Sequence, residues 1–300
     1  MPIEENQLRT WTALGSVVQS RDTYNSIKNV LEDLRSPYAL VTRQFDTFLQ
    51  GSYGNDTNVH GDSDVDIVIR QKSLFYYNLD ALSVPEKAEF RHVFHSPAQY
   101  DLPAFKMDVI AWLAENYGAD FDPNGNKAVY IRERGNRRNA DVLIAAEHRR
   151  FAAFPNAQNP QFAEGVIFFP LTGGSIINYP KQHSANLTAK HQATNEWLKP
   201  VIRVFKNMRN WMIRDAALNE GVAPSYFVEG LLYNVPRESF GGSLQATVGR
   251  CLDFAEYADQ TRLVCANYQH WLVRDNEKTS WPSANFATFV RTARQFWNDW

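Results

Sequence analysis

The pattern of apolar and polar residues divides the 300-residue chain into a first part that mixes strands with helices and a second part that is mostly helical. In the first part, residues 20–34 carry apolar side chains at helical spacing. Short runs at 67–70, 129–132 and 140–145 predict strands, and the Gly-Asn pair before the last run predicts a turn. This order of elements predicts an α+β fold.

From residue 194 onward the apolar spacing is that of helices, beginning with a helix over 197–214. A stripe of polar residues three and four positions apart follows this helix: Lys199, Arg203, Lys206 and Asn210. For Lys199 and Arg203 we expect a solvated helix face. A further helix is predicted to open at Ser225-Tyr226, directly after Pro224.

Residues 50–69 join a Gly-Ser turn, a polar loop and a strand that carries Asp64 and Asp66. Side chains two apart on a strand face the same side, so the two carboxylates are expected to point together. Their repulsion raises their pKa values unless a cation neutralises them. Mg²⁺ suits this position, because it takes oxygen ligands and keeps other positions for substrate phosphates. A calcium-type loop or a plain turn is the alternative.

The Asp-x-Asp pair follows Gly-Ser by about a dozen residues and leads into an apolar strand, a combination that predicts nucleotidyl transfer. Two-metal nucleotidyl transfer needs a third carboxylate, and two residues are candidates. Asp108 precedes a run of helical spacing, which suits an N-cap. Asp141 lies on an apolar strand, from which its side chain can project beside the first pair, and we favour it. A solubilising charge at a strand edge is the alternative for Asp141. We expect Asp62 to belong to the turn before the first strand.

Two sites suit phosphate. Gly51 lets the backbone approach an anion closely, successive N–H groups in the turn form a concavity, and the Ser52 hydroxyl adds a donor. An ordinary turn is the alternative there. Ser225, at the start of a helix, is either an N-cap or part of a phosphate site at the helix N-terminus.

The chain resembles a known family at these motifs. Gly51-Ser52-Tyr53 and the Gly-Asp-Ser-Asp-Val-Asp run at 61–66 resemble the signature of DNA polymerase β-like nucleotidyltransferases. The Asp-Ser-Asp-Val-Asp run is similar to the bacterial CD-NTases of anti-phage (CBASS) systems, whose animal relatives are cyclic GMP-AMP synthase and oligoadenylate synthase. The resemblance implies a polymerase β-like catalytic lobe with a mixed sheet over residues 1–180. It also implies a helical lobe over 181–300, like that of oligoadenylate synthase, that closes the nucleotide cleft.

The resemblance also implies roles for individual residues. Asp64, Asp66 and Asp141 would be catalytic and would hold two Mg²⁺ ions, with Mn²⁺ as an alternative. In the family, a lysine at the position of Lys206 reaches the donor triphosphate, and a serine and tyrosine matching Ser225-Tyr226 contact the triphosphate and stack on the donor base. The expected nucleotide-binding residues are Gln50, Gly51, Ser52, Lys206, Ser225 and Tyr226. His183 is expected to be a hydrogen-bonding residue of a loop or of the junction between lobes.

The implied function is the joining of NTP substrates into a cyclic di- or trinucleotide second messenger, with release of pyrophosphate. The product would switch on a separate effector protein, and regulatory proteins are further expected partners. One alternative is a single-transfer enzyme acting on a protein, RNA or small-molecule acceptor. Another is a catalytically idle nucleotide or nucleic-acid sensor. The sequence leaves open the bases used, the ring size, the linkage, the trigger and the oligomeric state.

Composition limits the remaining classes. A hydrophobic share of 44% is that of a globular protein rather than a disordered one. The formal net charge of −2 argues against a bulk attraction to nucleic acid or anionic membranes, so activation by nucleic acid is not indicated. With no signal-like segment, long apolar run or prenylation box recognised, we expect a cytoplasmic protein without a membrane partner.

Overall fold

The computed structural model describes residues 2–15, 17–60 and 64–300, so the turn assigned to Asp62 lies outside the described residues. The chain forms two compact units. The helical unit comprises residues 1–17, 50–63 and 181–300, and the sheet unit comprises residues 18–49 and 64–180. The helical unit thus contains residues 1–17 and 50–63 together with the C-terminal helices.

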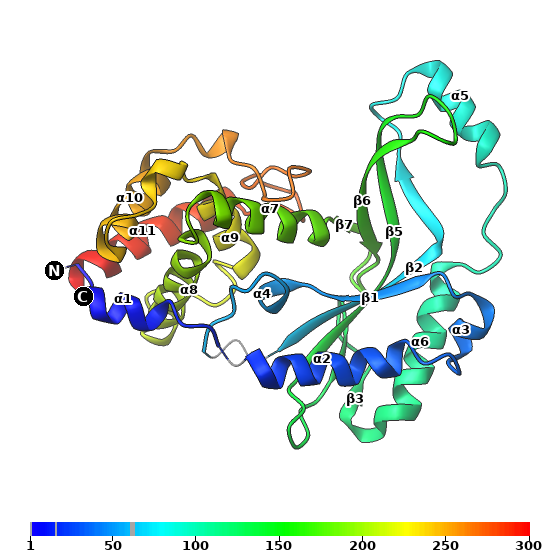
Figure 1. The fold of residues 1–300 in the computed structure, drawn as a ribbon, viewed down its shortest axis with the longest axis horizontal. Helices are drawn as coiled ribbons and strands as arrows, with labels where there is room; N and C mark the ends of the chain where they lie inside the picture. Colours follow the sequence, from blue (N-terminus) through cyan, green and yellow to red (C-terminus); the bar gives the residue numbers. More distant parts are fainter. Residues whose placement is uncertain (1, 16, 61–63) are drawn as a thin grey trace. The chain divides into compact units, whose positions relative to one another are not determined.

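The sheet unit is built on one mixed β-sheet (Figure 1). Its strands are β1 (Phe45–Leu49), β2 (Val65–Asn78), β3 (Phe121–Asp122), β4 (Val129–Ile131), β5 (Ala140–Ala153), β6 (Gln161–Phe168) and β7 (Ile176–Asn178). The hydrogen-bonded order is β1-β2-β5-β4-β3, with β6 pairing to both β5 and β7. β2 and β5 are parallel, and the other pairs are antiparallel.

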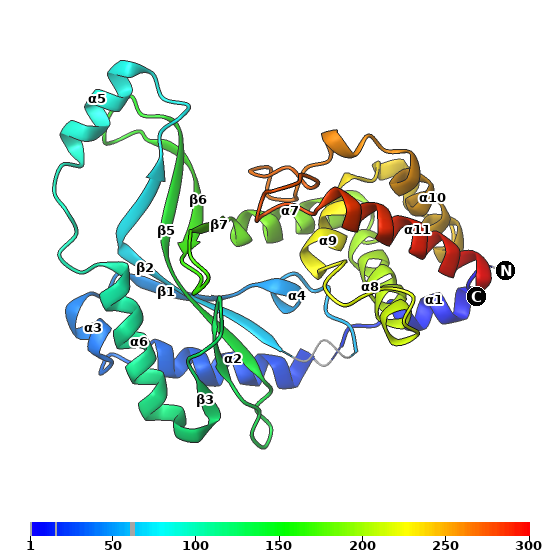
Figure 2. The ribbon, with the colours of Figure 1, turned by 180° about the vertical axis from the view of Figure 1, so that it is seen from behind.

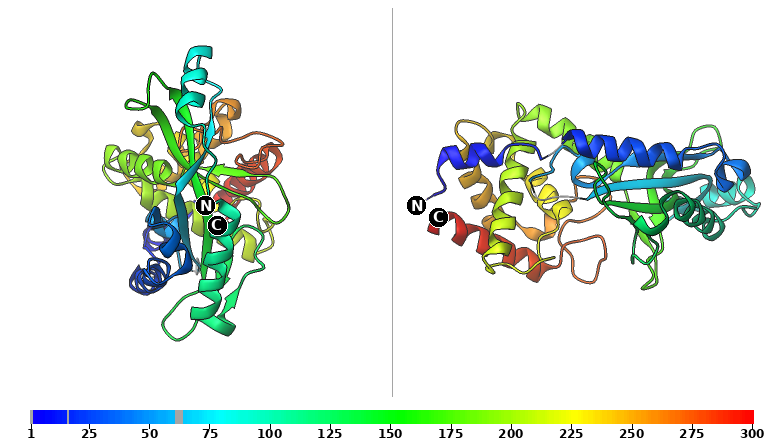
Figure 3. Two further views of the ribbon diagram at one scale, coloured as in Figure 1. Left: turned by 90° about the vertical axis from the view of Figure 1, so that its right-hand side faces the viewer. Right: turned by 90° about the horizontal axis from the view of Figure 1, so that it is seen from below.

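Helices cover one face and one end of this sheet. They are α2 (Val17–Leu31), α3 (Pro37–Val41), α5 (Val84–Val93) and α6 (Leu102–Tyr117). α2 and α6 lie together, since the Trp112 indole donates to the Val30 carbonyl at 2.8 Å, and Figure 3 shows α2 running alongside the strands. α5 covers the far end of the long strands, where Phe90 packs on Phe151 with ring centroids 5.1 Å apart.

Two of the predicted strands are longer than their apolar runs indicated. β2 continues to Asn78 past an irregularity between Gln71 and Phe75, and β5 continues to Ala153. The irregularity shifts the register by inserting residues on one strand, so the alternation breaks although pairing resumes beyond it. A simple period-2 pattern therefore stops at the bulge.

The N-cap role expected for Asp108 is wrong. Helix α6 begins six residues earlier, with Pro103 in its first turn, and Asp101 accepts a hydrogen bond from the Ala104 backbone at 2.9 Å. Proline favours this first-turn position because it lacks the N–H that would go unused there. Asp108 instead lies within the helix and accepts a hydrogen bond from the Tyr100 hydroxyl.

The helical unit packs around α8. Its helices are α1 (Glu5–Trp11), α4 (Gly51–Gly54), α7 (Pro180–Ala193), α8 (Leu198–Arg214), α9 (Ser225–Asn234), α10 (Leu244–Tyr257) and α11 (Ser283–Asp299). α8 contacts α1, α9, α10 and α11, and its apolar face, including Val201, Phe205 and Met208, is fully buried as the periodicity predicts. α10 and α11 lie side by side (Figure 2).

Among the described residues, none of the helices combines the length and the apolar character that crossing a membrane requires.

Candidate active site

The three predicted acids lie at adjoining strand ends in the sheet unit. Asp64 immediately precedes β2, Asp66 is the second residue of β2, and Asp141 is the second residue of β5. The parallel register sets Asp66 directly opposite Asp141. Partners in register share one face of a sheet, so these two carboxylates emerge side by side. The structure therefore brings together two acids that are 75 positions apart in the sequence.

Burial of the alternating residues fixes which way the acids point. Val65 and Ile67 on β2, and Val142 on β5, are completely buried, whereas Asp66 and Asp141 are partly exposed. A slip of one residue would turn the acids into the apolar layer, which is costly for charged groups. The alternation at the strand starts thus holds the carboxylates on the opposite face.

The electrostatics of this group suit a cation. Burial and the negative charge of Asp64 raise the pKa of Asp141. Burial and the charges of Asp64 and Asp141 likewise raise the pKa of Tyr130, which pairs with Asp141 across β4 and β5. A divalent cation would relieve this crowding of like charges, and carboxylate oxygens are the ligands that Mg²⁺ prefers.

The described side chains near these acids do not form a complete set of metal ligands. Within residues 2–15, 17–60 and 64–300, no three His, Cys, Asp or Glu side chains converge closely enough to hold a metal ion. The donor chemistry and the strand register fit Mg²⁺. The assignment of Asp64, Asp66 and Asp141 as metal ligands stays a prediction.

In the helical unit, the Gly-Ser turn begins the short helix α4. Gly51 has φ +64°, in the left-handed region that glycine adopts at little cost. Gln50 stands at the N-cap in an extended conformation, and its side chain makes no capping hydrogen bond. The turn exists as predicted, while the binding of a phosphate by Gln50, Gly51 and Ser52 stays a prediction.

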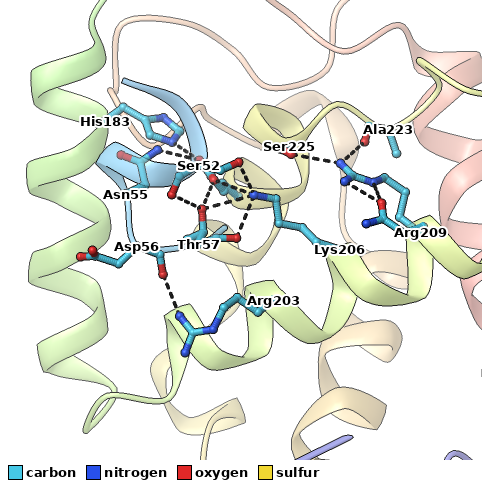
Figure 4. A network of polar contacts seen from close by, with 12 residues as sticks. Ser52, Asn55, Asp56, Thr57, His183, Arg203, Lys206, Arg209, Ala223 and Ser225 are labelled. Atoms are coloured by element: carbon cyan, nitrogen blue, oxygen red, sulfur yellow. Dashed lines mark hydrogen bonds and ion pairs between the residues drawn. The ribbon is translucent and has the colours of Figure 1, made fainter. Parts of the chain in front are cut away.

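The structure brings two predicted residues into direct contact. The Lys206 ammonium donates to Ser52 Oγ at 2.6 Å and to the Thr57 carbonyl at 2.9 Å (Figure 4). Lys206 has no exposed surface, although it lies on the polar side of α8. A lysine buried this completely requires polar partners, because an isolated buried charge is very costly. Ser52 and Thr57 supply them.

A buried acid that the sequence analysis missed lies beside this lysine. Glu229 in α9 accepts hydrogen bonds from Asn55 Nδ2 at 2.9 Å, from His183 Nε2 at 2.8 Å and from the Thr57 hydroxyl. One of its oxygens lies 3.6 Å from Lys206 Nζ. A signal for it exists in the sequence, since Glu229 stands between Val228 and Leu231 on the apolar face of α9.

The pKa of Glu229 shows that its neighbours stabilise the ionised carboxylate. Burial alone would raise it, but the hydrogen bond from His183, the charge of Lys206 and the hydrogen bond from Thr57 lower the pKa to about 2. Glu229 is therefore a carboxylate at neutral pH, and its charge balances that of Lys206.

Ser225 and Tyr226 both lie at the start of α9. Pro224 takes the N-cap position, so the capping alternative for Ser225 is wrong, and the Ser225 hydroxyl accepts from Arg209 Nη1 at 3.1 Å. The Tyr226 ring stacks on His183, with centroids 4.7 Å apart and planes 22° from parallel. Burial raises the pKa of Tyr226 well above its usual value. Contacts of Ser225 and Tyr226 with a nucleotide stay predictions.

His183 forms a hydrogen bond through Nε2, as expected of a hydrogen-bonding residue, but it belongs to helix α7 rather than to a loop.

The solvated face expected for Lys199 and Arg203 is wrong. Lys199 is 6% exposed and Arg203 is 8% exposed. Lys199 Nζ donates to the Asp56 carboxylate at 3.0 Å, and Arg203 Nη1 donates to the Asp56 carbonyl at 2.7 Å. Three residues of the polar stripe of α8, Lys199, Arg203 and Lys206, are thus in contact with residues 52–57 of the same unit. Spacing alone does not distinguish a stripe covered by a distant segment from one covered by water.

Comparison with known proteins gives matches over part and over all of the chain. Residues 185–298 match the cGAS/DncV-like nucleotidyltransferase C-terminal helical domain. The sequence is 35% identical over 302 residues to the cyclic UMP-AMP synthase of Rhodothermus marinus, covering 100% of this chain and 99% of that protein. It is 32% identical over 307 residues to the cyclic nucleotide synthase CdnE01 of Staphylococcus haemolyticus, covering 100% of both.

The fold is similar to a solved relative as well. The structure of Rhodothermus marinus CdnE c-UMP-AMP synthase with Apcpp and Upnpp aligns with a TM-score of 0.86 and 32% identity, covering 100% of this chain and 98% of that one. The predicted α+β class is confirmed. Identity at this level over the full length shows that this chain belongs to the CD-NTase family, the cGAS/DncV-like nucleotidyltransferases.

Proposed function

We propose that this protein joins NTPs into a cyclic di- or trinucleotide second messenger, with release of pyrophosphate and with dependence on Mg²⁺. The observation that carries the proposal is the side-by-side placement of Asp66 and Asp141 in the parallel register of β2 and β5, with Asp64 one residue before the strand. Acids grouped in this way suit metal-assisted phosphoryl transfer. The full-length relatives, which are named as cyclic nucleotide synthases, agree with it.

The phosphate contacts are assigned to the helical unit. The Ser52 hydroxyl and the backbone at Gly51 contact the donor triphosphate, and the charge of Lys206 acts on it through Ser52, with which its ammonium is in contact. Ser225 adds a hydroxyl at the start of α9, where free backbone N–H groups and the helix dipole favour anions. Tyr226 supplies a ring for the donor base, and Gln50 lines the pocket.

The acids of the sheet unit hold the metal ions. Asp64, Asp66 and Asp141 would be the carboxylate ligands of the two Mg²⁺ ions, with Mn²⁺ as an alternative. When bound, the ions supply Lewis-acid stabilisation of the charge on the attacking and leaving oxygens. The reaction forms a bond from a sugar hydroxyl of one NTP to the α-phosphorus of another, as the bond to pyrophosphate breaks. A second transfer closes the ring.

The cellular role is proposed from the family alone. The cyclic product activates a separate effector protein in anti-phage signalling, and regulatory proteins control the enzyme.

Mass spectrometry of the products formed from all four NTPs with Mg²⁺ tests the proposal. We expect a small, phosphatase-resistant product that is lost in the Asp64→Asn, Asp66→Asn double variant. Product formation only after adding a protein, RNA or small-molecule acceptor would favour single transfer. Tight RNA binding without turnover would favour a sensor.

A further inference from the structure

Glu229 contacts several of the polar residues of the helical unit described above. It is 1% exposed, and its two oxygens receive hydrogen bonds from Asn55, Thr57 and His183. The Lys206 ammonium lies 3.6 Å away. A carboxylate only accepts, so each of these partners must turn a donor toward it. One side chain of α9 therefore sets the orientation of groups in two helices and in the segment that follows α4.

The contacts lead from Glu229 to Ser52 in three steps, through Thr57 and Lys206. The Thr57 hydroxyl donates to Glu229, and the Thr57 carbonyl accepts from Lys206 at 2.9 Å. Lys206 also donates to Ser52 Oγ at 2.6 Å. A hydroxyl carries one proton and two lone pairs. Because Ser52 Oγ accepts from the ammonium, its own proton is directed at another acceptor. A phosphate oxygen of the NTP is the acceptor that the proposed function supplies.

We propose that Glu229 is a positioning residue for the triphosphate contact. It fixes Thr57 and Lys206 so that the ammonium meets Ser52 Oγ, and the Ser52 hydroxyl then presents its proton to the phosphate. Glu229 itself touches neither the NTP nor the reacting atoms. This inference rests on the proposed function, because the triphosphate is its ligand.

The main test measures the affinity of purified protein for non-hydrolysable α,β-methylene analogues of the four NTPs, together with the corresponding nucleosides. Glu229→Gln keeps the shape of the side chain, removes the charge and turns an amide N–H₂ toward donors. We expect the triphosphates to bind about tenfold more weakly, because the loss of one hydrogen bond to a charged group has about this effect. Nucleoside binding should be unchanged. Equal loss for nucleosides would mean a general collapse of the pocket and would overturn the inference.

A second pair of variants avoids dependence on the folding of Glu229→Gln. Thr57→Val removes the hydroxyl that Glu229 orients and keeps the volume, whereas Thr57→Ser keeps the hydroxyl. We expect Thr57→Val to weaken triphosphate binding several-fold and Thr57→Ser to restore it. Wild-type affinity in both Thr57→Val and Glu229→Gln would overturn the inference.

The path through Ser52 is tested by combining variants. If Glu229 acts through Ser52, Glu229→Gln adds no further loss to that caused by Ser52→Ala. Fully additive losses would overturn the inference. Glu147→Gln in the sheet unit is the matched control: Glu147 is also 1% exposed and accepts from Arg149 at 2.6 Å. It should lower stability and leave triphosphate affinity unchanged.

The same measurements separate this inference from the proposed function. A wild-type protein that forms cyclic product, with Glu229→Gln and Thr57→Val binding triphosphates equally well, overturns the inference alone. A wild-type protein that binds none of the analogues and forms no nucleotide product overturns both.

Discussion

The predicted site residues of the helical unit and of the sheet unit differ in how their charges are balanced. In the helical unit, Lys206 and Glu229 are both buried, and the pKa of Glu229 is lowered to about 2 by its hydrogen bonds and by the lysine. In the sheet unit, burial and the charge of Asp64 raise the pKa of Asp141. The first set is stabilised by its own protein partners, and the second is crowded by like charge.

This difference predicts whether a substitution in each set affects mainly stability or mainly activity. Removing one member of a matched buried pair leaves the other buried without its counter-charge, so stability should fall. Removing one of several crowded carboxylates relieves repulsion, so the fold should tolerate the change while a metal-dependent activity is lost. Variants in the two units therefore separate folding from chemistry.

The largest effect on activity is expected from the acids. Asp64→Asn combined with Asp66→Asn should reduce product formation by at least about three orders of magnitude, because both metal ions lose carboxylate ligands. Stability in urea should stay equal or rise slightly, since negative charge next to Asp141 is removed. Quantitative product analysis and urea unfolding of the same preparations measure both. Product at wild-type levels would rule out the metal assignment.

The largest effect on stability is expected from Lys206. Lys206→Met leaves the Glu229 carboxylate buried without its cation, and such breaks cost about 3–5 kcal/mol. Replacing both partners, with Lys206→Met and Glu229→Leu, should recover much of this loss while nucleotide binding stays weak. Urea unfolding measures the free energy of unfolding. A single variant that is as stable as wild type would mean that the pair is not matched in the way described.

The same pair gives a pH dependence with a definite sign. The pKa of Glu229 is lowered from 4.5 to about 2, so between these values the unfolded chain binds more protons than the folded one. Its contribution to stability is fully present above about pH 4.5 and is lost as the pH falls toward 2. Unfolding free energies measured across this range should show a smaller slope in Glu229→Gln than in wild type.

The acids and the Gly-Ser turn were predictable from sequence because local pattern determines them. Alternation around Val65 and Ile67 sets the direction of Asp66, and a glycine at the start of α4 serves the positive φ of its turn. The turn pattern also indicated Ser52, and the resemblance to the family indicated Lys206, although neither predicted their contact. These features depend on neighbours within a few residues.

The partners of Glu229 and the burial of Lys199 and Arg203 were not predictable, because they depend on a segment more than 140 positions away. Residues 52–57 cover the polar stripe of α8 and bring Thr57 to Glu229. Helical spacing places a charge on a face but does not say what covers that face. The full length of β2 escaped detection for a related reason, since its bulge breaks the period while pairing to β5 continues.

A smaller effect on stability is expected when Mg²⁺ is added. The ion should stabilise the wild-type protein by about 1.4 kcal/mol at ten times its dissociation constant, a rise in Tm of a few degrees. Asp141→Asn should reduce this rise and, without metal, should be at least as stable as wild type at neutral pH. The reason is that a raised carboxyl pKa means the ionised form destabilises the fold at high pH.

Thermal unfolding with and without Mg²⁺ at pH 7 and pH 4 measures this linkage. The rise should shrink at pH 4, because protons compete for the carboxylates. Ca²⁺ at equal ionic strength controls for ion specificity, and Glu147→Gln controls for the loss of an acid elsewhere in the sheet unit. An equal rise in Asp141→Asn would mean that Asp141 does not bind the ion.

The smallest effect is expected from a second ion pair on α8, which contrasts with Lys206 and Glu229. The Asp56 side chain is 67% exposed, although Lys199, which donates to it, is almost fully buried. An ion pair open to solvent contributes about 0–1 kcal/mol and is screened by salt. Asp56 has φ +55°, a conformation that asparagine tolerates, so Asp56→Asn should cost less than about 1 kcal/mol and leave product formation unchanged. Urea unfolding at low and high salt tests this prediction. Salt should weaken the ion pair between Asp56 and Lys199 in the wild-type protein, whereas Asp56→Asn has no such pair to weaken. A loss of stability as large as that of Lys206→Met would show that solvent exposure does not determine how much each ion pair contributes. The contrast between the buried pair and the solvent-screened pair would then not hold, even for two pairs on the same helix.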